Sequence, residues 1–159
     1  MDWQFEAVEQ AMINATYWNV NLYNTLDRND GFMREDFSLI GTITGLPGHE
    51  GKELRNLDAA VRPYVMAASA EPKYQHFNMR TKAFELILRG KPVDAPMVIY
   101  VPAVHQHPWQ PVHYVDGFDV LYNGNVFKEW TMETNQLSFY LDSTVDLHSI
   151  NVRPRAHHP

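Results

Sequence analysis

The sequence predicts an α+β domain in which helices pack on one face of an antiparallel sheet. In the N-terminal half, apolar residues recur at three- and four-residue steps, as they do in amphipathic helices. In the C-terminal half they alternate with polar residues, as they do in half-buried strands. Helices followed by a run of strands are typical of this class, and 159 residues are enough for one domain with a sizeable core.

The N-terminal half is expected to hold two long helices. The first covers residues 3–28, with Asp2 as its N-cap and Asp30 followed by glycine as its stop. The second covers residues 52–70 and is kinked at Pro63, since proline cannot donate the helical hydrogen bond. Between them we expect a helical turn over 32–37, a short strand over 38–44 and a glycine- and proline-rich loop over 45–51.

The C-terminal half is expected to form the antiparallel sheet. Its clearest signal is Asn123-Gly124 between two alternating runs, because both residues tolerate the positive φ of a tight hairpin turn. Residues 145–159 are polar and contain proline and histidine, so we expect a tail after a single domain over 1–144. The expected strands cover 75–89, 97–104, 112–122 and 126–140.

Composition excludes several classes of function. The net charge of −6 and the lack of a basic run argue against a nucleic-acid partner. The absence of cysteine excludes disulfides, thiol catalysis and cysteine-type zinc sites. No secretory signal and no apolar run of membrane-spanning length is visible, which predicts a cytoplasmic protein without a membrane partner. The aromatic content of 13% suits an apolar ligand cavity, a subunit interface or simply an aromatic core.

Asp119 is the first candidate for chemistry. It lies inside an expected strand between Phe118 and Val120, where a carboxylate is costly unless it is paired, hydrated or used. If its face of the strand lines a cavity, desolvation would make it a general acid or base. The structural alternative is a carboxylate that is hydrogen-bonded to a neighbouring tyrosine or histidine, or that points at solvent.

Three histidines lie close to this carboxylate in the sequence. His105 and His107 share a strand face if the strand continues, and with His113 they could bind a divalent metal. No glutamate follows at the spacing that such a site would use. Structural or loop positions are therefore expected for at least two of the three, and no metal or other cofactor is predicted.

Three segments carry a resemblance to a known family. Residues 23–30 resemble the end of the family's first helix, residues 48–54 its glycine-led entry to the third helix, and residues 117–130 its closing hairpin. On these segments the chain resembles the SnoaL-like polyketide cyclases of the nuclear-transport-factor-2-like superfamily. The chain departs from the family at 104–109, where Val-His-Gln-His-Pro-Trp replaces the usual Thr-His-x-Gly.

The resemblance implies a fold and an activity. The fold would be a cone-shaped barrel of a curved antiparallel sheet, with N-terminal helices packed on its concave face, in a homodimer. The activity would be cofactor-independent cyclisation, isomerisation or dehydration of a carbonyl-bearing, polyketide- or terpenoid-like small molecule. Asp119 would move a proton with His105, or with His107, as its partner. An aromatic residue of the first helix, Tyr23, would polarise the carbonyl.

The remaining candidates would contact the substrate, and each also has a structural explanation. The aromatic ones are better explained as core residues, Asp36 as an exposed surface carboxylate or a helix cap, and His76 as part of a solvated polar stripe along its strand. These candidates are His107, Trp18, Tyr64, Asp36, Trp130 and His76.

Two other functions stay open at this point. The first is a non-catalytic ligand-binding or dimerisation module of the same fold, because a fold does not determine a function. The second is a metal enzyme that uses the histidine cluster.

Overall fold

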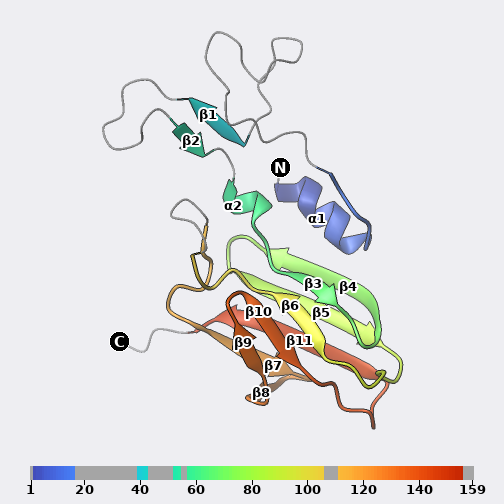
Figure 1. The fold of residues 1–159 in the computed structure, drawn as a ribbon. Helices are drawn as coiled ribbons and strands as arrows, with labels where there is room; N and C mark the ends of the chain where they lie inside the picture. The colour runs from blue at the N-terminus through green and yellow to red at the C-terminus, as the bar shows by residue number, and fades with distance from the viewer. Residues whose placement is uncertain (1, 17–38, 43–51, 55–56, 106–110, 156–159) are drawn as a thin grey trace. The chain divides into compact units, whose positions relative to one another are not determined.

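A computed structural model describes residues 2–16, 39–42, 52–54, 57–105 and 111–155 (Figure 1). The chain divides into two compact units, of which one comprises residues 1–14 with 59–159 and the other residues 15–58. In the second unit, β1 (Ile40–Thr42) pairs with β2 (Lys52–Leu54) as an antiparallel ribbon.

The first unit is built from two antiparallel sheets, and its core lies between them (Figure 1). The four-stranded sheet has the order β3-β6-β10-β9, and the five-stranded sheet has the order β4-β5-β11-β7-β8. Their bounds are β3 Tyr64–Ala67, β4 Glu71–Asn78, β5 Ala83–Arg89, β6 Met97–Tyr100, β7 Phe118–Tyr122, β8 Asn125–Phe127, β9 Thr131–Glu133, β10 Gln136–Phe139 and β11 Leu147–Pro154.

The alternating pattern of the strands explains this core. In β5, Phe84, Leu86 and Leu88 are fully buried while the residues between them reach solvent, as expected for a strand with one covered face. The four-stranded sheet presents its own buried side chains to the same core, among them Ile99 and Leu137. The result is a β-sandwich.

The predicted fold class was wrong. The described residues hold eleven strands and only two short helices, α1 (Asp2–Gln10) and α2 (Leu57–Ala60), and no helices lie on the concave face of a cone. Helix α1 ends early because Met12 adopts a φ of 52°, and Ile13, Asn14 and Thr16 after it are weaker helix formers than alanine or leucine. Residues 17–28 of this predicted helix lie outside the described part of the chain.

The second predicted helix, over 52–70, is divided among β2, α2 and β3. Pro63 separates α2 from β3, because a proline there removes a helical hydrogen bond. After it, Tyr64 and Val65 are residues that favour strands, and they alternate between the two faces of β3. The apolar residues at helical spacing in this segment therefore belong to a short helix, α2, and to the strand that follows it, β3.

Two predictions for the C-terminal half also differ from the structure, one for a strand and one for the tail. The expected strand over 75–89 is a hairpin, because the Asn78 side chain accepts hydrogen bonds from the backbone N–H of Arg80 and Thr81 at 3.0 Å and so starts a turn. The expected tail over 145–159 contains β11, which is the central strand of the five-stranded sheet. The buried positions of β11 are His148, Ile150 and Val152. Because the first of them is a histidine, the apolar alternation in the sequence is too short to predict a strand.

The turn at Asn123-Gly124 was predicted correctly. Both residues have positive φ, 48° and 81°, and Tyr122 pairs with Asn125 across the turn. The second strand of this hairpin is short, however. After β8 the chain leaves the five-stranded sheet and enters the other sheet at β9.

The described helices include none with the length and apolarity needed to cross a bilayer.

Candidate functional site

Asp119 does not face His105 across neighbouring strands. Asp119 lies on β7, which pairs with β8 and β11, whereas His105 follows β6 in the other sheet. The Asp119 carboxylate is 3.5 Å from Nε of Arg155, at the surface of the sandwich. Arg155 also donates from Nη2 to the Phe118 carbonyl at 3.3 Å. The carboxylate thus reaches solvent, as in one form of the structural alternative, but its partner is an arginine and not the tyrosine or histidine expected in the other form.

The described histidines do not form a metal site. No group of three or more histidine, aspartate or glutamate side chains with metal-binding geometry occurs among the residues that the structure describes. His113 lies with Nε2 2.6 Å from the Val61 carbonyl oxygen and with its ring 5.1 Å from that of Phe77. His105 is exposed, and His107 is outside the described residues.

The other predicted site residues are dispersed. Trp18, Tyr23 and Asp36 lie outside the described residues. His76 is on β4, with Nδ1 3.8 Å from a Glu6 carboxylate oxygen. The remaining two are Tyr64, on β3, and Trp130, directly before β9, so both lie on or beside the four-stranded sheet.

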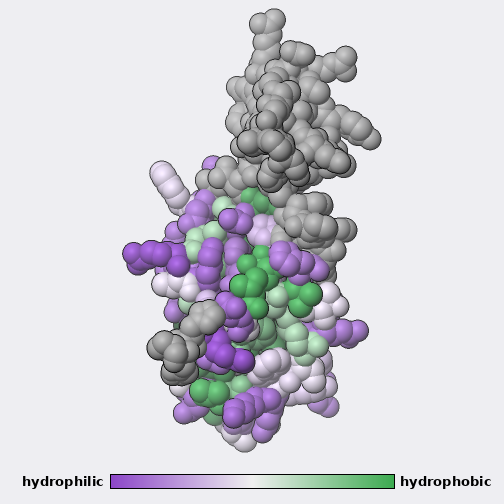
Figure 2. Space-filling model, turned by 90° about the vertical axis from the view of Figure 1, so that its left-hand side faces the viewer, coloured by the Kyte–Doolittle hydropathy of each residue, from purple (hydrophilic) through white to green (hydrophobic). Residues whose placement is uncertain are grey.

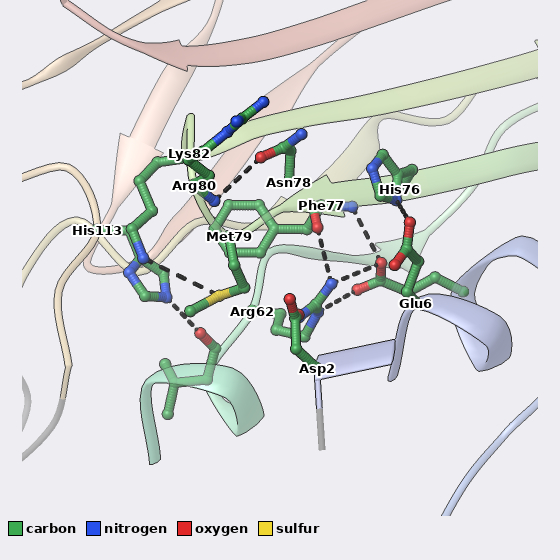
Figure 3. A network of polar contacts seen from close by, with 12 residues as sticks. Asp2, Glu6, Arg62, His76, Phe77, Asn78, Met79, Arg80, Lys82 and His113 are labelled. Atoms are coloured by element: carbon green, nitrogen blue, oxygen red, sulfur yellow. Dashed lines mark hydrogen bonds and ion pairs between the residues drawn. The ribbon is translucent and has the colours of Figure 1, made fainter. Parts of the chain in front are cut away.

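A buried ion-pair network ties α1 to β4 (Figure 3). Arg62 lies 2.5 Å from Glu9 through Nε, 3.1 Å from its second oxygen through Nη2, and 2.6 Å from Asp2 through Nη1. Phe77 completes the network, since its carbonyl accepts from Arg62 at 2.8 Å and its N–H donates to Glu9 at 3.0 Å.

One cation in this network, Arg62, is paired with two carboxylates, Glu9 and Asp2. Burial on its own would lower the pKa of the Arg62 guanidinium. Hydrogen bonds to Glu9 and Asp2, and the charges of these carboxylates, outweigh burial, so the pKa of Arg62 is raised. Both Glu9 oxygens already accept hydrogen bonds, which leaves this carboxylate suited to holding the helix rather than to acid–base chemistry.

A groove opens where the chain crosses between the sheets. Its volume is about 340 Å³, within the range of ligand pockets. Trp130 and Tyr140 supply aromatic surface, and Lys128 and Glu129 supply opposite charges. The other residues along it are Pro96, Thr131, Ser138 and Phe139.

The groove has one fixed and one exposed aromatic side. The indole of Trp130 stacks on Phe118 at 5.4 Å, and its Nε1–H donates to the Phe127 carbonyl at 3.1 Å. Tyr140 follows the buried Phe139, so its ring points outwards and is 63% exposed. A rigid half-buried ring beside an accessible one, with charged and hydroxyl groups at the rim, is an arrangement that binds ligands with an apolar face and polar edges.

Of the residues that line this groove, the sequence predicted only Trp130 as a site residue. Tyr140, Lys128 and Glu129 were missed because residues 126–140 were taken as one continuous strand, which hides the crossing between sheets. The signal that was available is the pair Phe139-Tyr140, in which one aromatic residue of two neighbours in a strand must point away from the core.

Hydrophobic side chains also gather on the surface of the described unit. On the face seen in Figure 2 they form a central green group bordered by hydrophilic residues. The large hydrophobic residues that reach solvent include Tyr64 and Met66 of β3. Exposed apolar side chains that group at a surface are candidates for binding.

No family model matches the sequence, and no curated protein does. Among solved structures, the chain is similar to sterylglucosidase 1 of Cryptococcus neoformans, with a TM-score of 0.73 and 17% identity over 96% of this chain and 24% of that one. It is also similar to endo-glycoceramidase II from Rhodococcus sp., with a TM-score of 0.60 and 16% identity over 98% of this chain and 29% of that one.

This likeness shows the fold alone. The chain spans about a quarter of the length of the structures that it matches best among these. The neighbours are glycosidases and not SnoaL-like proteins.

Proposed function

We propose that the sandwich is a non-catalytic sugar-binding module, in which the groove between Trp130 and Tyr140 holds a glycoside. The observation that carries this proposal is the composition of the groove. A pyranose ring has apolar C–H faces that pack on aromatic rings and a rim of hydroxyl groups that need hydrogen-bond partners. Trp130 and Tyr140 suit the faces, and Lys128, Glu129 and Ser138 suit the rim.

The comparisons support the sugar class. Both similar structures are glycosidases by name, and endo-glycoceramidase II was solved with a cellobiose-like imidazole and as a lactosyl-enzyme intermediate. That this chain binds sugars as well is part of the proposal, because a shared fold does not determine a shared ligand.

Binding without hydrolysis suits the groove better than catalysis. Glycoside hydrolysis generally uses two carboxyl groups on opposite sides of the scissile bond. Among the described residues that line the groove, Glu129 is the single carboxylate. Asp119, the carboxylate singled out in the sequence, is not one of the lining residues and is paired with Arg155.

The test is a titration of the protein with cellobiose and with lactose, in which binding is measured by calorimetry and by tryptophan fluorescence. We expect binding of at least one disaccharide by the wild type, and at least a tenfold weaker affinity in Tyr140→Ala, because the accessible stacking surface is lost. Leu147→Ala is the matched control, since Leu147 is also exposed, at 61%, but lies on the other sheet.

Two results would count against the proposal. One is a wild type that binds neither disaccharide. The other is an affinity that falls equally in Tyr140→Ala and Leu147→Ala, which would place the effect outside the groove.

A further inference from the structure

The groove continues onto the outer face of the four-stranded sheet. Thr131 and Ser138 line the groove and are opposite each other on β9 and β10, and the Thr131 hydroxyl is 3.5 Å from the Ser138 carbonyl oxygen. Ser138 is in turn opposite Val98 on β6. Since side chains on paired positions share a face, the groove and the outer face form one continuous surface.

One further row of side chains crosses this outer face. Tyr64 is opposite Tyr100, Tyr100 is opposite Gln136, and Gln136 is opposite Glu133. The next position along each strand holds a residue that packs in or against the core. Because neighbouring side chains in a strand point to opposite faces, the side chains of this row point away from the core. These inward residues are Val65, Ile99, Leu137 and Met132.

The row has the same chemistry as the groove. The rings of Tyr64 and Tyr100 are 5.2 Å apart at an angle of 31°, and Tyr64 is 46% exposed. Beside this aromatic end, Gln136 and Glu133 offer an exposed amide and an exposed carboxylate. Aromatic surface with hydrogen-bonding groups at its edge thus occurs twice on one surface.

The two aromatic positions are separated by more than the length of one sugar. From β10 to β3 there are two inter-strand spacings, about 10 Å in all, and from Tyr140 to Gln136 the chain advances four residues, about 14 Å. A pyranose unit spans about three to four single bonds of about 1.5 Å each, so its length is on the order of one inter-strand spacing, about 4.8 Å. A disaccharide in the groove therefore ends before Tyr64, whereas a longer linear saccharide reaches it.

We infer that the outer face is a second subsite of the same binding surface, on which Tyr64 stacks against a distal sugar of a linear saccharide seated in the groove. The occupant is a neutral saccharide, because the carboxylates of Glu129 in the groove and Glu133 in the row disfavour an anionic chain. This inference rests on the proposed function of the groove.

The second subsite predicts a dependence on chain length. A sugar chain that occupies the groove places its distal unit near Tyr64 at high effective concentration, so the second contact adds affinity. In the wild type we expect cellohexaose to bind about tenfold more tightly than cellobiose. In Tyr64→Ala this difference is expected to disappear, while the affinity for cellobiose stays as in the wild type.

Calorimetric titration with cellobiose and cellohexaose measures both quantities. Val126→Ala is the control, because Val126 is 62% exposed on β8 of the other sheet. Gln136→Ala is a second variant that does not disturb the aromatic pair, and it is expected to weaken only the binding of cellohexaose. Circular dichroism and thermal unfolding establish that each variant is folded.

The outcomes separate the two proposals. If the wild type binds neither saccharide, the proposed function fails and this inference fails with it. If cellobiose and cellohexaose bind equally, or if Tyr64→Ala keeps the tenfold difference, only the second subsite is overturned. Tyr64-dependent self-association in analytical ultracentrifugation, or Tyr64-dependent binding to phosphatidylcholine vesicles that carry no sugar, would also overturn it by assigning the face to another occupant.

Discussion

The hydroxyl of Tyr122 lies 2.6 Å from Nδ1 of His148, whose imidazole is completely buried. Nε2 of the same ring is 3.1 Å from the Gly90 carbonyl oxygen, which can only accept a hydrogen bond. Nε2 therefore carries the proton and Nδ1 accepts from Tyr122. The tyrosine oxygen in turn accepts from the backbone N–H of Asp142 at 3.1 Å, so this chain of hydrogen bonds joins β7, β11 and two loops.

Replacing Tyr122 by phenylalanine leaves the buried Nδ1 without a donor. We expect the free energy of unfolding to fall by about 1–3 kcal/mol, the usual cost of an unsatisfied buried polar group. Urea unfolding monitored by circular dichroism measures it. Tyr140→Phe is the matched control, because the exposed Tyr140 hydroxyl should change stability by less than about 0.5 kcal/mol. Equal effects of the two variants would contradict this account of the network.

Tyr114 makes the sandwich sensitive to alkaline pH. Burial raises its pKa well above the usual value near 10, because the phenolate would lose its hydration, and its hydroxyl donates to the Lys82 carbonyl at 2.9 Å. The folded state thus binds this proton more tightly than the unfolded state does. The corresponding stability is fully present below about pH 10 and is lost progressively as the pH rises towards the folded-state pKa.

Urea unfolding at pH 8 and pH 11 tests this dependence. The wild type is expected to lose about 1.4 kcal/mol per pH unit above 10 through Tyr114, in addition to any loss from other tyrosines. Tyr114→Phe should be less stable than the wild type at pH 8 and should lose less stability between the two pH values. An identical loss in both proteins would show that Tyr114 does not govern the alkaline transition.

The Arg62 network predicts strong coupling between two residues. Arg62→Met leaves the Glu9 carboxylate buried without its cation, so we expect a loss of about 3–5 kcal/mol in the free energy of unfolding. Glu9→Leu together with Arg62→Met removes both charges and should recover part of that loss. A double-mutant cycle from urea unfolding gives the coupling energy, and additive single effects would contradict direct pairing. Asp2→Asn, at the exposed edge of the network, should cost less than about 1 kcal/mol.

The sequence predicted those parts of the fold in which local chemistry decides the structure. Asn123-Gly124 forms the expected turn because positive φ at both positions is a local requirement. The segment after Pro63 was misread because tertiary burial of Val65 against the core decides between strand and helix, and a short apolar run fits both periods.

The site was harder to predict because it depends on which sheet each strand joins. Lys128, Glu129 and Tyr140 meet only because β8 and β9 belong to different sheets, which no local pattern reveals. Trp130 was nominated for its residue type and does line the groove. Asp119 was nominated because a carboxylate inside an apolar strand is costly, but its side chain lies on the face that reaches solvent and near Arg155, which is 36 positions away in the sequence, so the expected cost does not arise.

Asp119 offers a direct contrast between a structural and a catalytic carboxylate. Its partner Arg155 is mostly exposed and the two charged atoms are 3.5 Å apart, so solvent screens the pair and its contribution to stability is small. We therefore expect Asp119→Asn to change the free energy of unfolding by less than about 1 kcal/mol and to leave cellobiose binding unchanged. Arg155→Gln is the matched variant for the pair, although it also removes the hydrogen bond to the Phe118 carbonyl and should cost somewhat more. Urea unfolding and calorimetric titration measure both quantities, and a loss of saccharide affinity in Asp119→Asn would return this carboxylate to the functional site.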